Sequence, residues 1–229
     1  MTQYDDTETF GPMEASWTFR LTRNPLRLSR VAAMMLLPAL VFLSACGGQF
    51  ETEYGQPIDA NVSQTWRVTA VNVTVPDSLT VSDENSFLPR ADIVWHGDPP
   101  GDRRAQVQKI VAASAKTAVS GLRGNRPVAL NMTVQAFHGV SPIALARAPE
   151  AVYAMAFLAQ ITDARTGTAL TPLTHIQADT PALVGEAGIN AAQFGPTQTE
   201  QVSSHIVATL QGWLGIGPDV SGSFTSLGR

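Results

Sequence analysis

The chain has 229 residues, 44% of them hydrophobic, and a formal net charge of −4. This composition suits one globular domain with appended segments, and it does not suggest a disordered chain. The acidic balance, together with the lack of a basic stripe along any candidate helix, argues against a nucleic-acid partner. Cys46 is the only cysteine, which excludes an intrachain disulfide and a zinc site built from cysteines.

Residues 1–45 have the order of a secretory signal peptide. Four arginines, the last of them Arg30, precede an apolar run over residues 31–43 and then two small residues. A membrane-spanning helix needs about 20 apolar residues, so this run is too short for a comfortable span. The segment ahead of the arginines is acidic, which suits a signal peptide poorly and leaves Met1 and Met13 as alternative starts.

The segment LSACG, residues 43–47, resembles the lipobox of bacterial lipoproteins, in which a leucine and two small residues precede an invariant cysteine. The resemblance implies that Cys46 is acylated and becomes the mature N-terminus; the alternative is an accidental or buried cysteine after an uncleaved helix. Because one acyl chain binds a membrane only marginally, a stable anchor implies two or more chains. In such lipoproteins a residue other than aspartate after the cysteine goes with outer-membrane sorting, and Gly47 stands there. We therefore expect a lipid-anchored protein that faces the periplasm, with the outer membrane favoured over the inner.

The segment 46–65 is polar, shows no periodicity and contains glycine and proline, which predicts a flexible tether. A tether of this length reaches roughly 23 Å, so it keeps the domain near the membrane and lets it turn. One folded domain is expected over residues 66–214. The Gly/Ser-rich tail at 215–229 is predicted to be disordered.

The spacing of apolar residues changes within the first half of the domain. β-Branched residues predict a strand over 66–75, which Pro76 ends, and a shorter strand over 91–95. Apolar positions then recur at three- and four-residue steps, which predicts an amphipathic helix over 107–122.

The second half returns to strands. Alternation predicts a half-buried strand over 127–137, and a nearly continuous apolar run over 153–162 predicts a central one. DARTG, residues 163–167, is typical of a hairpin loop, so 170–178 is expected to pair back. A helical period covers 198–214. The whole pattern predicts an α+β fold: a two-layer sandwich in which two helices cover one face of a mostly antiparallel sheet of four to five strands.

The stretch DIVWHGDPPGDRR, residues 92–104, concentrates charge at the junction between a strand and a helix. Asp102 just before the helical period is a good N-cap, because its carboxylate accepts bonds from unpaired backbone N–H groups. Arg103 and Arg104 oppose the helix dipole there. They are expected either to pair with Asp92, Asp98 or Asp102, or to contact an external anion or an acidic partner.

Known catalytic and metal-binding spacings do not appear. His96 beside Asp98 forms a possible acid–base pair, but no nucleophile or metal ligand stands at a recognised spacing from it. The four histidines lie 30 or more residues apart, and neither HExxH nor GxSxG is present. We therefore expect no catalytic residue, no metal site and no cofactor.

Two long connections carry apolar residues. The loop 139–151 contains Ile143, Leu145 and Arg147, and the segment 181–197 contains further apolar residues. Loops of this length are often functional, so these residues either pack into the core or meet a partner.

Beyond the signal and lipobox, the blocks DIVWHGDPPGDRRAQV and PVALNMTVQAFHGVSP and the strand entering DARTG resemble a family of uncharacterised Gram-negative lipoproteins. More loosely, a lipobox, a tether and an α+β domain with a TG hairpin are similar to small envelope lipoproteins that assist transport systems. Neither resemblance implies a residue-level role.

The preferred hypothesis is a non-enzymatic accessory or scaffold of a cell-envelope complex, anchored through Cys46 and contacting a protein partner through Arg103, Arg104, Ile143, Leu145 and Arg147. The alternative is a carrier of lipid or another apolar ligand. A hydrolase that uses His96 and Asp98 is the third hypothesis.

Overall fold

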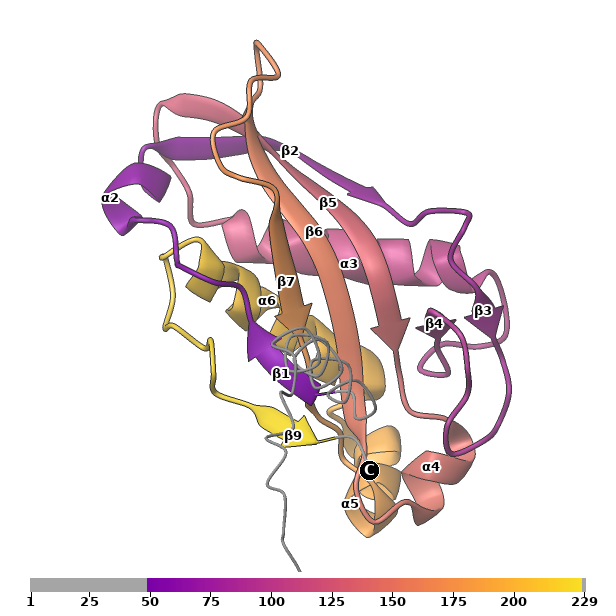
Figure 1. The fold of residues 1–229 in the computed structure, drawn as a ribbon. Coiled ribbons are helices and arrows are strands. Elements are labelled where there is room, and N and C mark those ends of the chain that lie inside the picture. Colours follow the sequence, from indigo (N-terminus) through magenta and orange to yellow (C-terminus); the bar gives the residue numbers. More distant parts are fainter. Residues whose placement is uncertain (1–48, 228–229) are drawn as a thin grey trace, which may run out of the picture. The chain divides into compact units, whose positions relative to one another are not determined.

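The computed structural model describes residues 49–227, and these residues form a mixed α/β domain (Figure 1). Nine strands join in one sheet, and the described part of the chain contains five helices. The predicted signal peptide and Cys46 lie outside the described residues. The expected sheet of four to five strands with two helices is thus too small, because the structure adds short elements at both ends of the domain and within its loops.

The centre of the sheet is an antiparallel pair of long strands. β5 (Arg126–His138) pairs with β6 (Val152–Asp163), with Leu130 opposite Ile161. Both residues are fully buried, as the continuous apolar run in β6 predicts. A bulge in β5 between Val134 and Ala136 shifts the register once.

On the outer side of β5 the pairing is parallel. β2 (Trp66–Thr74) lies along the first part of β5, while the short strands β4 (Ile93–Val94) and β3 (Val81–Ser82) continue the sheet beside its last two residues. The chain returns from β4 to β5 through α3 (Arg103–Val119), and parallel strands need a crossover of this kind. The sheet is therefore mixed: these three pairings are parallel, while the five others are antiparallel, as the prediction of a mostly antiparallel sheet requires.

On the other side, β6 pairs with β7 (Thr174–Ala178) and, near its start, with β8 (Thr180–Pro181). The predicted loop at Asp163 joins β6 to β7: its carboxylate accepts two backbone N–H groups of the turn, and Gly167 takes a φ of 73°. Glycine adopts that backbone conformation without strain.

Both ends of the domain also belong to the sheet. β1 (Gln49–Glu53) lies between β7 and β9 (Thr225–Leu227), antiparallel to both. The short helix α2 (Ala60–Ser63) follows β1. Residues 49–65 are therefore ordered rather than a tether, and residues 215–227 are ordered rather than a loose tail. The cause is long-range pairing together with burial of Tyr54, neither of which a local pattern reveals.

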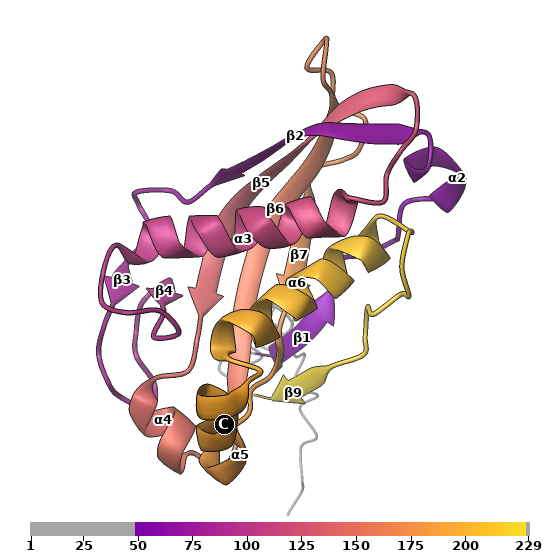
Figure 2. The same cartoon turned by 180° about the vertical axis from the view of Figure 1, so that it is seen from behind.

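Two helices cover one face of the sheet (Figure 2). α3 and α6 (Gln198–Trp213) pack against each other across it, and α6 begins with a capping box formed by Thr197 and Glu200. The core between the helices and the sheet is built from fully buried aromatic and aliphatic side chains, the largest of which are Trp66, Trp95, Trp213, Tyr54, Tyr153, Phe137 and Phe157. Among the described residues, no helix is long and apolar enough to cross a membrane.

Two further helices replace predicted loops. α4 (Pro142–Arg147) lies within the connection 139–151, where the Ser141 side chain accepts the Ala144 N–H and proline fixes the first turn. α5 (Gly185–Phe194) occupies most of 181–197. The two helices pack against each other at one end of the domain.

Candidate functional site

The junction between β4 and α3 holds the residues that the sequence singles out. Asp102 caps α3, as predicted: its Oδ1 accepts the Ala105 N–H at 3.1 Å. The turn that contains Pro99 precedes the cap, and its Pro99 carbonyl accepts hydrogen bonds from Arg103 and Gln106 in the first turn of α3. The start of α3 just after Asp102 sets the directions in which the side chains of Arg103 and Arg104 leave the helix.

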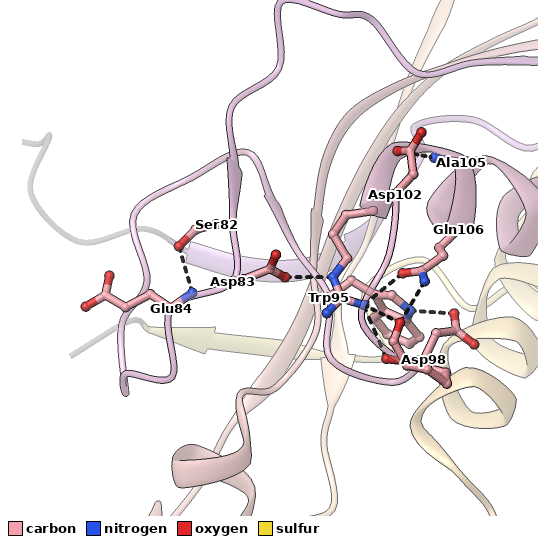
Figure 3. Close-up of polar contacts among 10 residues, drawn as sticks. Ser82, Asp83, Glu84, Trp95, Asp98, Asp102, Ala105 and Gln106 are labelled. Carbon is pink, nitrogen blue, oxygen red and sulfur yellow. Dashed lines mark hydrogen bonds and ion pairs between the residues drawn. The ribbon is translucent and has the colours of Figure 1, made fainter.

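Arg103 points into the protein, and only 6% of it is exposed. Its Nε donates to Asp83 Oδ1 at 2.7 Å (Figure 3), and its Nη1 donates to the backbone carbonyl oxygens of Asp98 at 3.2 Å and Pro99 at 3.1 Å and to Gln106 Oε1 at 2.9 Å. The acidic partner is therefore Asp83 and none of the three predicted aspartates. The guanidinium joins the β3–β4 connection to the turn before α3.

The carboxylate of Asp98 accepts a hydrogen bond from a different side chain, that of Trp95. Its Oδ2 accepts the Trp95 indole N–H at 2.7 Å (Figure 3), and Trp95 is fully buried edge-to-face against Phe137, with ring centroids 5.4 Å apart. A Cβ at Gly97 or at Gly139 would collide with the indole ring, so both glycines are needed for this packing. Asp98 thus positions a core side chain.

His96 does not form the predicted pair with Asp98. No hydrogen bond joins the two side chains among the described residues, and the His96 Nε2 is buried without a partner there. Burial lowers the pKa of His96, and the nearby charge of Arg103 lowers it further. The ring therefore favours its neutral form, and the acid–base hypothesis has no assembled pair at this position.

Arg104 also forms hydrogen bonds within the domain. Its Nη2 donates to the backbone carbonyl oxygens of Asp77, at 3.2 Å, and of Leu79. These carbonyls lie in the connection that leaves β2. Both arginines therefore hold loops in place, and the burial of Arg103 removes it from the set of possible contact residues. A contact through Arg104 stays a prediction.

The three residues predicted on the 139–151 loop lie on α4. Leu145 is partly buried against the core, and its Cγ approaches Gly188 of α5. The Ile143 backbone N–H donates to Asn85 Oδ1 at 2.8 Å, while Arg147 is exposed. Leu145 therefore follows the packing alternative, and contact through Ile143 or Arg147 stays a prediction.

A groove that the sequence does not predict runs between β2 and the C-terminal half of α3. It encloses about 380 Å³ and is open to solvent. Arg67 from β2, Lys116 from α3 and Arg123 from the following turn line it, and all three are exposed. Its lining contains no carboxylate, and neither ion pair of the described residues uses these three cations. The groove therefore presents unneutralised positive charge beside an edge strand.

The groove continues into a second hollow of about 640 Å³, which shares Ser120, Leu122 and Arg123 with it and reaches Gln211 of α6. Sequence reasoning could not find this surface, because Arg67 stands far from the other two cations in the sequence. Only the parallel β2–α3–β5 arrangement brings them together. Within residues 49–227, no group of three or more His, Cys, Asp or Glu side chains could hold a metal ion.

Comparisons with known proteins give a family and distant structural similarities. The model of a family of unknown function, DUF6778, matches residues 66–229. No curated protein matches the chain. The chain is similar to a "putative lipoprotein" from Caulobacter crescentus CB15, with 13% identity over 70% of this chain and 99% of the other and a TM-score of 0.32. It is also similar to the PelC dodecamer from Paraburkholderia phytofirmans, with 13% identity over 72% and 96% of the two chains and a TM-score of 0.31.

Proposed function

The chain belongs to the DUF6778 family, a family of unknown function, and from its residues we propose that it is a lipid-anchored envelope protein that acts as a non-enzymatic accessory or scaffold. The anchor is Cys46, and the domain faces the periplasm from the outer membrane. The partner is a protein of a cell-envelope complex that offers an acidic, extended segment to the groove between β2 and α3.

The observation that carries the partner proposal is the joint lining of this groove by Arg67, Lys116 and Arg123. Unpaired cations that surround one hollow attract an acidic partner and select against a basic one. The neighbouring β2 is an edge strand, because it pairs with β5 alone. An edge strand can accept a further extended segment through its free backbone groups. Charge and backbone thus favour the same kind of ligand.

The anchor is tested by the mass and the location of the protein. Acylation predicts that the full chain, expressed in a Gram-negative host, is cleaved before Cys46, gains the mass of its acyl chains and sediments with membranes. A Cys46→Ala variant is expected to lose both the added mass and the membrane fraction. Identical masses and fractionation of the two chains would contradict the proposal.

The partner is tested by cross-linking in intact cells followed by detergent extraction and mass spectrometry. A double variant, Lys116→Glu with Arg123→Glu, is expected to lose the cross-linked envelope protein and to stay folded and membrane-bound. The matched control, Lys109→Glu with Arg165→Glu, changes the charge equally at exposed positions outside the groove. Equal loss of the partner in both variants would show that overall charge matters rather than the groove. Cross-links to lipid alone would favour a carrier.

A further inference from the structure

The ordered start of the domain limits how far it can move from a lipid anchor. Only Gly47 and Gly48 separate Cys46 from Gln49, the first residue of β1. Three steps of fully extended chain span about 10 Å at 3.3–3.6 Å per residue. If Cys46 carries the lipid, the start of β1 must lie at the membrane surface, because no tether of twenty residues is available. The surface around Gln49 then faces the lipid.

The strands that flank β1 show what surrounds Gln49. On one side Leu227 of β9 stands directly opposite it in the antiparallel register. On the other side the Glu51 carbonyl accepts the Asp179 N–H, and the chain continues through β8 into Leu183 and α5. Figures 1 and 2 both show β9 pointing toward the end of the domain that α4 and α5 occupy, opposite the β6–β7 hairpin.

This end carries most of the exposed large hydrophobic residues. Six of the nine in the described chain lie in β9, in α5 and the segment leading to it, and in the loop that is hydrogen-bonded to α4. We name this set the apolar end: Phe87, Leu88, Leu183, Ile189, Phe194 and Leu227. Phe194 is 83% exposed and Leu227 71% exposed.

Hydrogen bonds and helix packing connect two parts of the apolar end, the Phe87–Leu88 loop and α5. Ser141, the cap of α4, donates to the Ser86 carbonyl at 2.6 Å, and the Asn85 side chain accepts the Ile143 N–H. The loop that carries Phe87 and Leu88 is therefore held against α4, which in turn packs against α5.

The low charge of the segment that contains α5 agrees with contact to lipid rather than water. Residues 181–199, which include α5, contain a single charged side chain, that of Glu186. Exposed apolar side chains at an interface bury about 5–10 Å into the boundary between headgroups and acyl chains, and they add to a lipid anchor as a second membrane contact. An aqueous surface of the same size would ordinarily carry more charge.

We propose that the apolar end is a membrane-docking surface, which inserts Phe194 and Leu227 into the bilayer beside the lipid of Cys46 and fixes the orientation of the domain. This inference rests on the proposed anchor at Cys46. It places the β6–β7 hairpin away from the membrane. A second copy of the chain is the competing occupant of the same surface, and the experiment below separates the two.

The test uses the acylated protein, produced in the host from the full chain, in vesicles of phosphatidylethanolamine and phosphatidylglycerol. The chain has one cysteine, so acylation of Cys46 leaves an introduced thiol as the only one that reacts. Phe194→Cys and Leu227→Cys report on the apolar end. Leu173→Cys, 60% exposed in the β6–β7 connection, is the matched control. Each thiol receives a fluorophore whose emission depends on polarity, and a nitroxide-bearing lipid serves as the quencher.

Docking predicts that the labels at 194 and 227 shift to shorter wavelength on reconstitution and are quenched several-fold more than the label at 173. Vesicles that carry the protein while all three labels report water would overturn the docking surface and leave the anchor intact. A label at 194 that is already shifted in detergent, and that the lipid nitroxide does not quench, would also overturn it in favour of a second copy. Labelling of Cys46 itself, with no protein on the vesicles, would overturn the anchor and the docking surface together.

Discussion

The carboxylate of Asp179 accepts the backbone N–H of Glu51 at 3.0 Å and thereby ties the first strand of the domain to the junction between β7 and β8. The same carboxylate accepts the Met155 N–H of β6 at 2.9 Å and both of its oxygens accept the side-chain amide of Gln177. Asp179 is fully buried. Burial raises its pKa, and these N–H donors act in the opposite direction.

Replacing Asp179 by Asn is expected to lower the free energy of unfolding by about 1–3 kcal/mol, the cost of leaving a buried polar group unpaired. Asparagine keeps one acceptor oxygen, so its amide group must face the N–H of either Glu51 or Met155. Urea unfolding of the two proteins measures the loss. Asp77→Asn, at an exposed loop position, is the control and should change little. An equally small change at position 179 would contradict a bonding role for the carboxylate.

Arg103 should stabilise the β4–α3 junction through its carbonyl contacts more than through its ion pair. The side chain of Asp83 is 63% exposed, and exposed pairs contribute up to about 1 kcal/mol. Asp83→Asn is therefore expected to lower the free energy of unfolding by less than about 1 kcal/mol. Arg103→Met removes the donor of the Asp98 carbonyl in a buried place and should cost about 1–3 kcal/mol. The denaturant midpoints of the two variants measure these losses of stability. Equal losses in the two variants would assign the stabilisation to the ion pair.

Tyr54 should hold the C-terminal segment of the domain. Its hydroxyl donates to Asp219 and accepts the backbone N–H groups of Val220 and Ser221, at 2.9 and 3.2 Å, while burial and Asp219 raise its pKa to about 12. Tyr54→Phe is expected to speed amide hydrogen exchange over residues 215–227 and to cost about 1 kcal/mol of stability.

The chain offers a matched control in Tyr153, whose buried hydroxyl has no hydrogen-bond partner among the described residues. Removing an unpaired buried hydroxyl costs nothing in lost bonds, so Tyr153→Phe should be neutral or stabilising. Slower exchange at 215–227 in Tyr54→Phe, or an equal destabilisation in Tyr153→Phe, would refute the assignment.

His205 gives the stability of the domain a pH dependence. It lies on α6 with its Nε2 3.3 Å from Thr52 Oγ1, and burial lowers its pKa. A lowered pKa means that the unfolded chain takes up the proton first. The stabilisation of the folded domain by neutral His205 is therefore present above about pH 6.5, the ordinary pKa of histidine. It is lost as the pH falls through the pKa of His205 in the folded chain.

Unfolding between about pH 8 and pH 5 should show a falling midpoint, and His205→Gln should flatten this fall. His96, whose pKa is lowered as well, contributes with the same sign, so a smaller fall remains. His175→Gln, at an exposed position of β7, is the control. A fall of unchanged steepness in His205→Gln would assign the dependence elsewhere.

The long helices and strands were predictable from the sequence because the spacing of their apolar residues matches the face that each of them buries. α3, β5, β6 and α6 lie where apolar spacing places them, and Asp102 caps α3 as expected. The short strands were not predictable. β1 reads QFETE and carries no strong local signal, so its strand state depends on β7, β9 and Asp179.

The charged junction shows the same limit at the level of one side chain. The sequence singles out Arg103 and predicts that an aspartate close in sequence pairs with it. The direction in which Arg103 leaves α3 instead leads to Asp83, in a loop whose position depends on the parallel strands β3 and β4. The cations of the groove were missed for a related reason, because only the crossover topology brings Arg67 to α3.

The pairing of β1 with β9 also limits when the sheet can finish folding. β1 is the first strand and β9 the last, so their ladder closes the longest loop in the domain and is expected to form late in folding. A chain that crosses a membrane from its N-terminus cannot finish its sheet until its final residues have emerged. If Cys46 is acylated during export, as proposed, the acylation would take place on a domain whose β1–β9 ladder has not yet formed.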